Sequence, residues 1–132
     1  MISRNIPRRG NDAFLKVSGR RVLLGNSPLY LTGLNLGGWL MPEGYILHAP
    51  NRGVRFFREQ FIRQRGAAEL TALERSFRDN FIQEDDFSRI KGLGVNSIRL
   101  PFHYGLIETK PYQYSKEGVR YLDHAIRWAK AQ

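Results

Sequence analysis

The pattern of apolar and polar residues predicts short strands at the start of the chain and helices after them. Residues 14–17 and 21–24 are short runs of strand-forming side chains, separated by a Ser-Gly pair that is typical of a turn. A second turn-forming cluster covers residues 25–28. The mainly apolar stretch 29–36 follows and predicts a longer, more deeply buried strand. The chain is therefore expected to begin its folded part with a hairpin that leads into a buried strand.

Four later segments are expected to form helices. Residues 54–65 predict a short basic helix that a glycine stops. In residues 67–81 the apolar side chains recur at spacings of three and four, the period of an amphipathic helix. Residues 84–93 begin with three acidic side chains, which the helix dipole favours, and Gly94 follows where a terminating glycine belongs. The last helix is expected from about 115 to 131.

The order of these elements indicates parallel β/α units. A short apolar strand at 95–100 lies between the last two helices, so the order is strand, helix, strand, helix. The glycine- and proline-rich stretch 37–53 predicts a long loop, and a loop of this length in a compact domain is usually functional or disordered. Two such units leave open sheet edges and one poorly covered sheet face. We therefore expect residues 14–132 to form an incomplete α/β domain.

The chain is basic, with 21 Lys and Arg against 12 Asp and Glu and a net charge of +9. Residues 1–21 and 52–65 carry the whole excess, and residues 1–13 predict a flexible basic leader. A net charge of this size suggests nucleic acid as a possible binding partner. No interleaving of aromatic and basic residues accompanies it, so the pattern favours solvated arginines, and we expect no nucleic-acid partner.

Several classes of protein are excluded or disfavoured by composition. The absence of cysteine excludes disulfides and thiolate metal sites. No apolar run approaches the roughly 18 residues of a membrane span, and we expect no membrane association. The start lacks the apolar core of a secretory signal, so a cytoplasmic location is expected if Met1 is the true start, with secretion left open. No phosphate-binding glycine motif, GxSxG turn or clustered histidines occur, and neither cofactor nor metal is expected.

Two places in the chain carry candidate chemistry. Gly37 and Gly38 follow the predicted first strand, which allows close approach of the backbone to a ligand. Trp39 then offers an apolar stacking face and Glu43 a carboxylate on the loop; the alternative is a tight turn with the indole packed in the interior. Arg99 lies near the end of the second strand, where ligands bind in β/α folds.

Each feature near Arg99 has a structural alternative. The guanidinium is costly to bury without a partner, and an ion pair with Glu108 is the structural alternative to a place in a cleft. His103 and Tyr104 follow the strand directly, and a lone histidine beside a proline turn is more often a surface residue than a base.

Three segments of the chain resemble a known enzyme family. They are GLNLGGWLMPEGY at 33–45, DDFSRIKGLGVNSIRLPFHY at 85–104 and YLDHAIRWAK at 121–130. Together they resemble the amino-terminal part of glycoside hydrolase family 5, most of all its cellulase and exo-β-1,3-glucanase branch. The resemblance covers about residues 14–132 and is thin across 46–80.

The resemblance implies an α/β fold, the N-terminal portion of a (β/α)8 TIM barrel. Residues 14–24 would form the hairpin that plugs the bottom of the barrel. Residues 31–35 and 96–100 would be its first two strands, with helices at about 84–93 and 115–131. Because a whole barrel needs about 250 residues, the chain would hold about two of the eight units.

The resemblance also implies a retaining glycosidase acting on β-glucosidic bonds in glucans, with two glutamates about 5 Å apart as nucleophile and acid/base. In the family these glutamates follow strands 4 and 7, and neither position exists here. Arg99 matches the arginine that supports the nucleophile, and Glu43 matches a glutamate that binds sugar hydroxyls in the −1 subsite. Asn35, Tyr104 and Trp39 would line the cleft. The fragment alone is therefore expected to be inactive.

Two other functions remain open from the sequence. One is a non-catalytic carbohydrate-binding protein that uses Trp39 and Glu43. The other is a basic nucleic-acid-binding module, for which only the net charge speaks.

Overall fold

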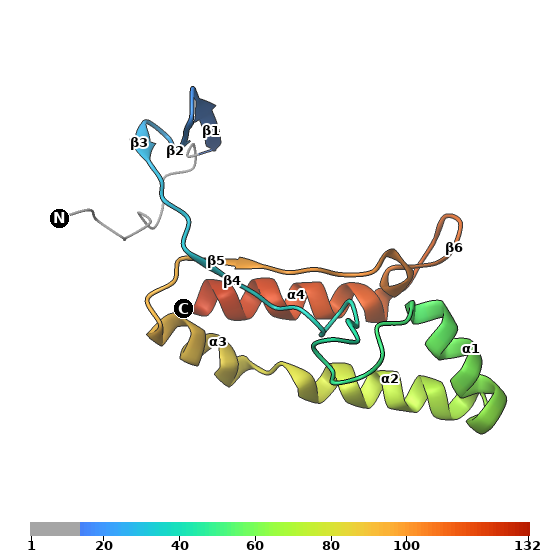
Figure 1. The fold of residues 1–132 in the computed structure, drawn as a ribbon. Helices are drawn as coiled ribbons and strands as arrows, with labels where there is room; N and C mark the ends of the chain where they lie inside the picture. The colour runs from blue at the N-terminus through green and yellow to red at the C-terminus, as the bar shows by residue number, and fades with distance from the viewer. Residues whose placement is uncertain (1–13) are drawn as a thin grey trace.

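The computed structural model describes residues 14–132, and the predicted leader at 1–13 lies outside these residues. The elements follow one another as shown in Figure 1. They are β1 (Leu15–Ser18), β2 (Arg21–Leu24), β3 (Ser27–Pro28), β4 (Gly33–Asn35), α1 (Val54–Arg65), α2 (Ala67–Phe81), α3 (Glu84–Gly92), β5 (Ser97–Arg99), the 3-10 helix η1 (Tyr104–Leu106), β6 (Glu108–Lys110), β7 (Gln113–Tyr114) and α4 (Lys116–Ala131).

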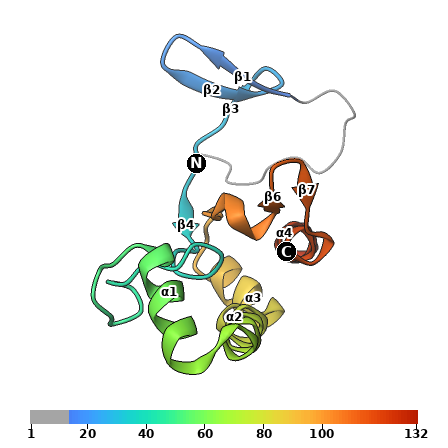
Figure 2. The ribbon, with the colours of Figure 1, turned by 90° about the vertical axis from the view of Figure 1, so that its right-hand side faces the viewer.

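The first three strands form an antiparallel sheet of their own, in the order β1-β2-β3. The predicted hairpin is therefore confirmed, and the short β3 extends it. Gly19 and Gly25 have φ angles of +57° and +61°, which explains why glycine stands at both turns. The sheet stands apart from the helices in both views (Figures 1 and 2), and an extended segment joins it to β4.

The central feature is a two-stranded parallel pair, β4 and β5, as the strand-helix-strand pattern predicted. Asn35 lies opposite Arg99 at the carboxyl ends of the strands. The strand β4 is shorter than the predicted 29–36, because the side chain of Asn96 replaces ladder pairing ahead of it. Its amide oxygen accepts from the Thr32 N–H at 2.9 Å, and its amide nitrogen donates to the Tyr30 carbonyl at 2.7 Å.

The helices have the predicted positions to within a few residues, and their ends have identifiable causes. A glycine, Gly66, separates α1 from α2. Gln83 and Asp86 form a reciprocal capping box at the start of α3, and Gly94 adopts a φ of +77° beyond its end. The Ser115 hydroxyl accepts from the Gly118 N–H at 3.1 Å and caps α4.

The core lies where the loop after β4 meets α3, η1 and α4. Its members are Leu36, Trp39, Leu40, Phe87, Leu106, Tyr121 and Ala125, packed together as one buried cluster. Figure 1 shows α4 running along the β4–β5 pair with α3 and α2 below it. Helices thus cover one face of the parallel pair.

Residues 104–114 contain three elements that the sequence analysis did not predict. The helix η1 follows His103 directly, and β6 and β7 pair as a small antiparallel hairpin before α4. None of the helices within residues 14–132 has the length and apolar character that crossing a membrane requires. The described residues therefore hold two parallel strands with their helices, and the (β/α)8 barrel stays a prediction.

Candidate functional site

Two of the predicted site residues, Asn35 and Arg99, meet at the carboxyl ends of β4 and β5. Asn35 is the last residue of β4 and Arg99 the last of β5, and the two are register partners. The Leu36 N–H donates to the Arg99 carbonyl at 3.0 Å and carries the pairing one residue further. Because parallel strands end at the same edge of a sheet, both side chains lie where ligands bind in β/α folds.

Arg99 is exposed and pairs with an amide. Its Nη1 donates to the Oδ1 of Asn35 at 2.8 Å. Within residues 14–132 no Asp or Glu side chain forms a salt bridge with it. The alternative ion pair with Glu108 is not formed among the described residues; that carboxylate accepts from the Tyr112 N–H at 2.8 Å. A guanidinium carries five N–H donors, and Asn35 is the one side chain within residues 14–132 for which a hydrogen bond from Arg99 is found.

Glu43 is held on the loop by two contacts. Its Oε2 accepts from the Gly38 N–H at 3.1 Å, and its Oε1 accepts from the Tyr45 hydroxyl at 2.9 Å. Gly38 has a φ of +79°, so its N–H points to the carboxylate from a conformation that favours glycine. A methyl group added at Gly37 would lie 2.8 Å from the Oε2 of Glu43 and 3.1 Å from the Nδ2 of Asn35. The carboxylate and the amide thus border the same small space above Gly37.

Tyr45 joins this group through its hydroxyl, although the sequence analysis did not single it out. The hydrogen bond to Glu43 raises the pKa of the Tyr45 phenol, with smaller contributions from burial and from the Glu43 charge. The charge of Arg99 acts in the opposite direction on the same pKa, so the guanidinium lies within electrostatic reach. A loop has no period that marks such a residue, and only the Glu-x-Tyr spacing could have pointed to it.

Trp39 lies in the core. Its exposed fraction is 1%, its ring stacks on Trp128 with centroids 6.2 Å apart, and it meets Tyr121 edge-on at 6.4 Å. The indole Nε1 donates to the Arg78 carbonyl of α2 at 2.8 Å. No ring face is therefore open to a sugar in this arrangement, and the packing alternative is the one that the structure supports.

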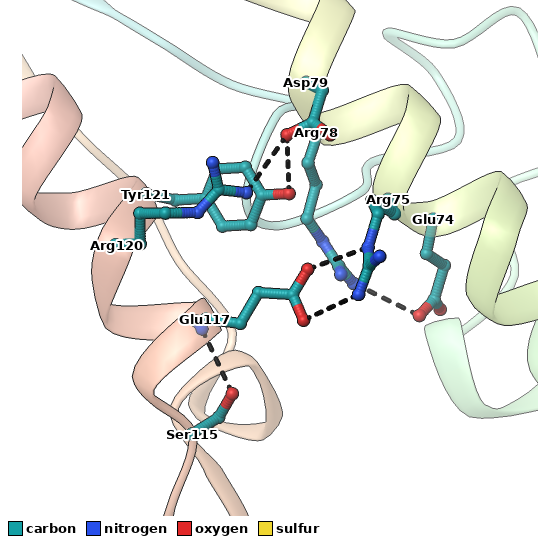
Figure 3. A network of polar contacts seen from close by, with 9 residues as sticks. Glu74, Arg75, Arg78, Asp79, Ser115, Glu117, Arg120 and Tyr121 are labelled. Atoms are coloured by element: carbon teal, nitrogen blue, oxygen red, sulfur yellow. Dashed lines mark hydrogen bonds and ion pairs between the residues drawn. The ribbon is translucent and has the colours of Figure 1, made fainter.

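A polar network between α2 and α4 fixes the surroundings of Trp39 (Figure 3). Arg75 of α2 pairs with Glu117 of α4 at 2.9 Å. Asp79 of α2 accepts from the Tyr121 hydroxyl at 2.8 Å and pairs with Arg120 at 3.3 Å. The two helices and the loop behind the site are thus tied together by hydrogen bonds as well as by the core.

Tyr104 lies beyond the end of β5 and is 72% exposed. Its ring lies 4.4 Å from that of His103, whose Nδ1 accepts from the Gly105 N–H at 3.1 Å. His103 thereby caps η1, which is a structural role.

The loop and the strand ends bring together four polar groups, none of which is buried. They are the guanidinium of Arg99, the amide of Asn35, the carboxylate of Glu43 and the phenol of Tyr45. Such a set offers both donors and acceptors, as recognition of hydroxyl groups requires. Within the described part of the chain, no group of three His, Asp or Glu side chains has a geometry that could hold a metal ion.

Comparison with known proteins gives relatives of one chemical class. No family model matches the chain. The probable glucan 1,3-beta-glucosidase A of Aspergillus clavatus is 32% identical over 102 residues, which cover 75% of this chain and 25% of the relative. The beta-xylosidase of Phanerodontia chrysosporium is 32% identical over 123 residues, covering 86% and 24%. Glucan 1,3-beta-glucosidase 2 of Wickerhamomyces anomalus is 30% identical over 135 residues, covering 95% and 30%.

The chain is related to glycoside hydrolases. It spans about a quarter of the length of the relatives that it matches.

Proposed function

We propose that residues 14–132 form the first part of a retaining β-glucan hydrolase of glycoside hydrolase family 5. The observation that carries this proposal is the contact between Arg99 and Asn35 at the shared end of two parallel strands, with Glu43 on the loop that follows. The glucosidase relatives support the substrate class. In the proposed fold β4 and β5 are the first two strands of a (β/α)8 barrel, with the β1–β3 sheet at its amino-terminal end.

Arg99 supports the nucleophile in this proposal. A retaining glycosidase uses two carboxyl groups about 5 Å apart, and we place both on glutamates outside residues 1–132. The exposed N–H groups of Arg99 hold the nucleophile carboxylate by charge-assisted hydrogen bonds, which favour its ionised form and fix its direction. Asn35 keeps the guanidinium in place through the 2.8 Å bond to its Oδ1.

Glu43 binds sugar hydroxyls in this proposal. Each of its oxygens already accepts one hydrogen bond, from Gly38 and Tyr45, and each carboxylate oxygen has room for a second. The two protein contacts fix the orientation of the carboxylate, so little ordering cost remains when a hydroxyl donates to it. Tyr104, an exposed aromatic residue at the start of η1, borders the cleft in this proposal.

A binding experiment tests the sugar-recognition part. Binding of a β-1,3-linked glucose disaccharide to the 132-residue chain is measured by calorimetry for the natural chain and for Glu43→Gln. Loss of one charged acceptor predicts at least about tenfold weaker binding. Glu59→Gln is the control, because Glu59 pairs with Arg55 on the surface of α1. No measurable disaccharide binding, or equal binding by both variants, would contradict the proposal.

A second measurement tests where the chemistry lies. The 132-residue chain should not hydrolyse an aryl β-glucoside, because the two catalytic glutamates lie outside it in this proposal. Clear turnover that is lost in Glu43→Gln would overturn that assignment. A longer polypeptide that contains these residues, binds glucan and hydrolyses none would instead favour the carbohydrate-binding alternative.

A further inference from the structure

A cavity of about 340 Å³ lies between the loop after β4 and the helices α1 and α2. Figures 1 and 2 show this loop beside α1. The walls are mainly apolar, and their main contributors are Leu47, Pro50, Phe56, Phe57, Leu73 and Phe77. The volume lies in the range of roughly 300–1,000 Å³ that is usual for small-molecule sites.

Several apolar side chains in the wall of this cavity remain exposed. Phe56, Phe57 and Leu73 are 50%, 48% and 43% exposed. Exposed apolar side chains that gather around a hollow are typical of binding sites, because a ligand that covers them releases the water there. Covering these side chains therefore favours a ligand with an apolar body.

Two charged side chains, Arg52 and Glu74, belong to the lining. The Glu74 carboxylate is already paired with two arginines, Arg58 at 2.6 Å and Arg78 at 3.2 Å. The guanidinium of Arg52 lies over the Phe56 ring, 5.7 Å from its centroid. Within residues 14–132 this guanidinium forms no ion pair. The charge left without a partner at the cavity is therefore positive, and it lies beside an aromatic wall.

We propose that this cavity binds an aliphatic carboxylate, with its alkyl chain against the aromatic wall and its carboxylate at Arg52. A guanidinium binds a carboxylate through charge-assisted hydrogen bonds. Because Arg52 is an exposed residue, the bound carboxylate stays in contact with water and avoids the cost of burying a charge. The alkyl chain alone leaves solvent and supplies the hydrophobic part of the affinity.

This site is separate from the candidate sugar site. The Glu43 carboxylate contacts Gly38 and Tyr45, and neither of these residues lines the cavity. The inference therefore goes beyond the proposed function and does not depend on it. Failure of carboxylate binding would leave the sugar site standing, and failure of disaccharide binding would leave this site standing.

The experiment compares carboxylates of two chain lengths with an amine of opposite charge. Binding of octanoate, hexanoate and heptylammonium to the 132-residue chain is measured by NMR titration at low salt. Octanoate has two more methylene groups than hexanoate, and their burial predicts about tenfold tighter binding. Heptylammonium has the alkyl chain of octanoate with a positive charge in place of the carboxylate. Octanoate should therefore bind about fivefold tighter than heptylammonium.

Substitutions test the two halves of the site separately. Arg52→Gln removes the cation and should bring the affinities of octanoate and heptylammonium to within about twofold of each other. Phe57→Ser and Leu73→Asn each place a polar group in the wall, and both should remove the preference for octanoate over hexanoate. Both side chains are partly exposed, so these substitutions leave the buried core intact.

Arg89→Gln is the matched control, because it removes the same charge from an exposed arginine of α3 that pairs with Asp86 at 3.5 Å. It should leave all three affinities unchanged, and circular dichroism verifies the helix content of every variant. An equal loss of octanoate binding in Arg89→Gln and Arg52→Gln would show attraction by net charge alone and overturn the inference. Equal binding of octanoate and hexanoate, or of octanoate and heptylammonium, by the natural chain would overturn it as well. Binding to vesicles of anionic phospholipid without binding of free octanoate would assign this face to a membrane surface instead and would also overturn the inference.

Discussion

Both carboxylate oxygens of Glu43 accept hydrogen bonds from the loop itself, and the space beside them is kept open by Gly37. A methyl group at position 37 would meet the Oε2 of Glu43 at 2.8 Å and the Cδ1 of Ile46 at 2.7 Å. Both contacts are with the ends of flexible side chains, which move aside at little cost. Gly37→Ala is therefore expected to displace the carboxylate and weaken disaccharide binding about tenfold, with little change in stability.

Gly53→Ala is the matched control, because a methyl group there meets no atom within 4 Å and the φ of Gly53 is −59°. Calorimetry gives the affinity, and urea unfolding followed by circular dichroism gives the stability. If Gly37→Ala bound the disaccharide as well as Gly53→Ala does, the carboxylate would not be the group that meets the sugar.

At the scale of elements, the start of α4 is fixed by a backbone contact that admits no side chain at Gly118. A methyl group at this position would overlap the carbonyl of Leu106 in η1, and a backbone carbonyl cannot turn aside like a side-chain end. Gly118→Ala is expected to lower the free energy of unfolding by at least about 2 kcal/mol. Gly92→Ala, in open space at the end of α3, should instead be neutral or raise it by up to about 1 kcal/mol. Urea unfolding of both variants gives these differences, and a tolerated Gly118→Ala would mean that η1 and α4 are not packed in this way.

The network between α2 and α4 predicts a pH dependence. Burial raises the pKa of the Tyr121 phenol above its ordinary 10.0, and the hydrogen bond to Asp79 makes the second-largest contribution in the same direction. The folded chain therefore holds this proton more tightly than the unfolded chain does. The stabilisation is complete below pH 10 and is lost as pH rises through the higher pKa of the folded state.

The substitution Tyr121→Phe isolates the contribution of the Tyr121 phenol to the pH dependence of stability. The variant should be less stable at pH 7 by about 1 kcal/mol, because the bond to Asp79 is lost, and its stability should fall less steeply above pH 10. Thermal unfolding from pH 7 to 11 checks both expectations, with Tyr114→Phe at an exposed position as control. An alkaline loss of stability as steep in Tyr121→Phe as in the natural chain would exclude Tyr121 as its source.

At the scale of the whole molecule, local periodicity predicts the elements well because each helix carries its own apolar stripe and end signals. The helix over 67–81 has the predicted bounds, and Gly94 takes the left-handed conformation expected of it. The hairpin of β6 and β7 escapes prediction because strands of two and three residues are too short to show a period. The strand β4 is shorter than its apolar pattern because the side chain of Asn96 satisfies the backbone ahead of it.

Part of the candidate site could be predicted from the sequence, because residues at the ends of parallel strands lie at the same edge of a sheet. Asn35 and Arg99 each stand at the end of a predicted parallel strand, which predicts that they are neighbours. In the structure the Nη1 of Arg99 lies 2.8 Å from the Oδ1 of Asn35. The loop that holds Glu43 has no period, so only the Glu-x-Tyr spacing hinted at its contact with Tyr45. Trp39 shows the limit of composition: an indole serves equally well as a sugar platform or as a core side chain, and only its contacts with Trp128 and Tyr121 decide between them.

The molecule consists of parts that differ in how deeply they are packed. Within residues 14–132 all the buried core residues belong to the region from Leu36 onward, whereas Leu15 and Val17 of β1 and the preceding Phe14 are exposed. Local opening of a segment costs little when few apolar contacts are lost. Backbone amides of β1 and β2 are therefore expected to exchange with solvent deuterium at least about a hundredfold faster than those in the middle of α4. Mass spectrometry of peptides from the exchanged chain measures both rates, with the exposed helix α1 as an internal reference. Equal protection of the sheet and of α4 would show that the sheet is covered in solution and would contradict the arrangement in Figures 1 and 2.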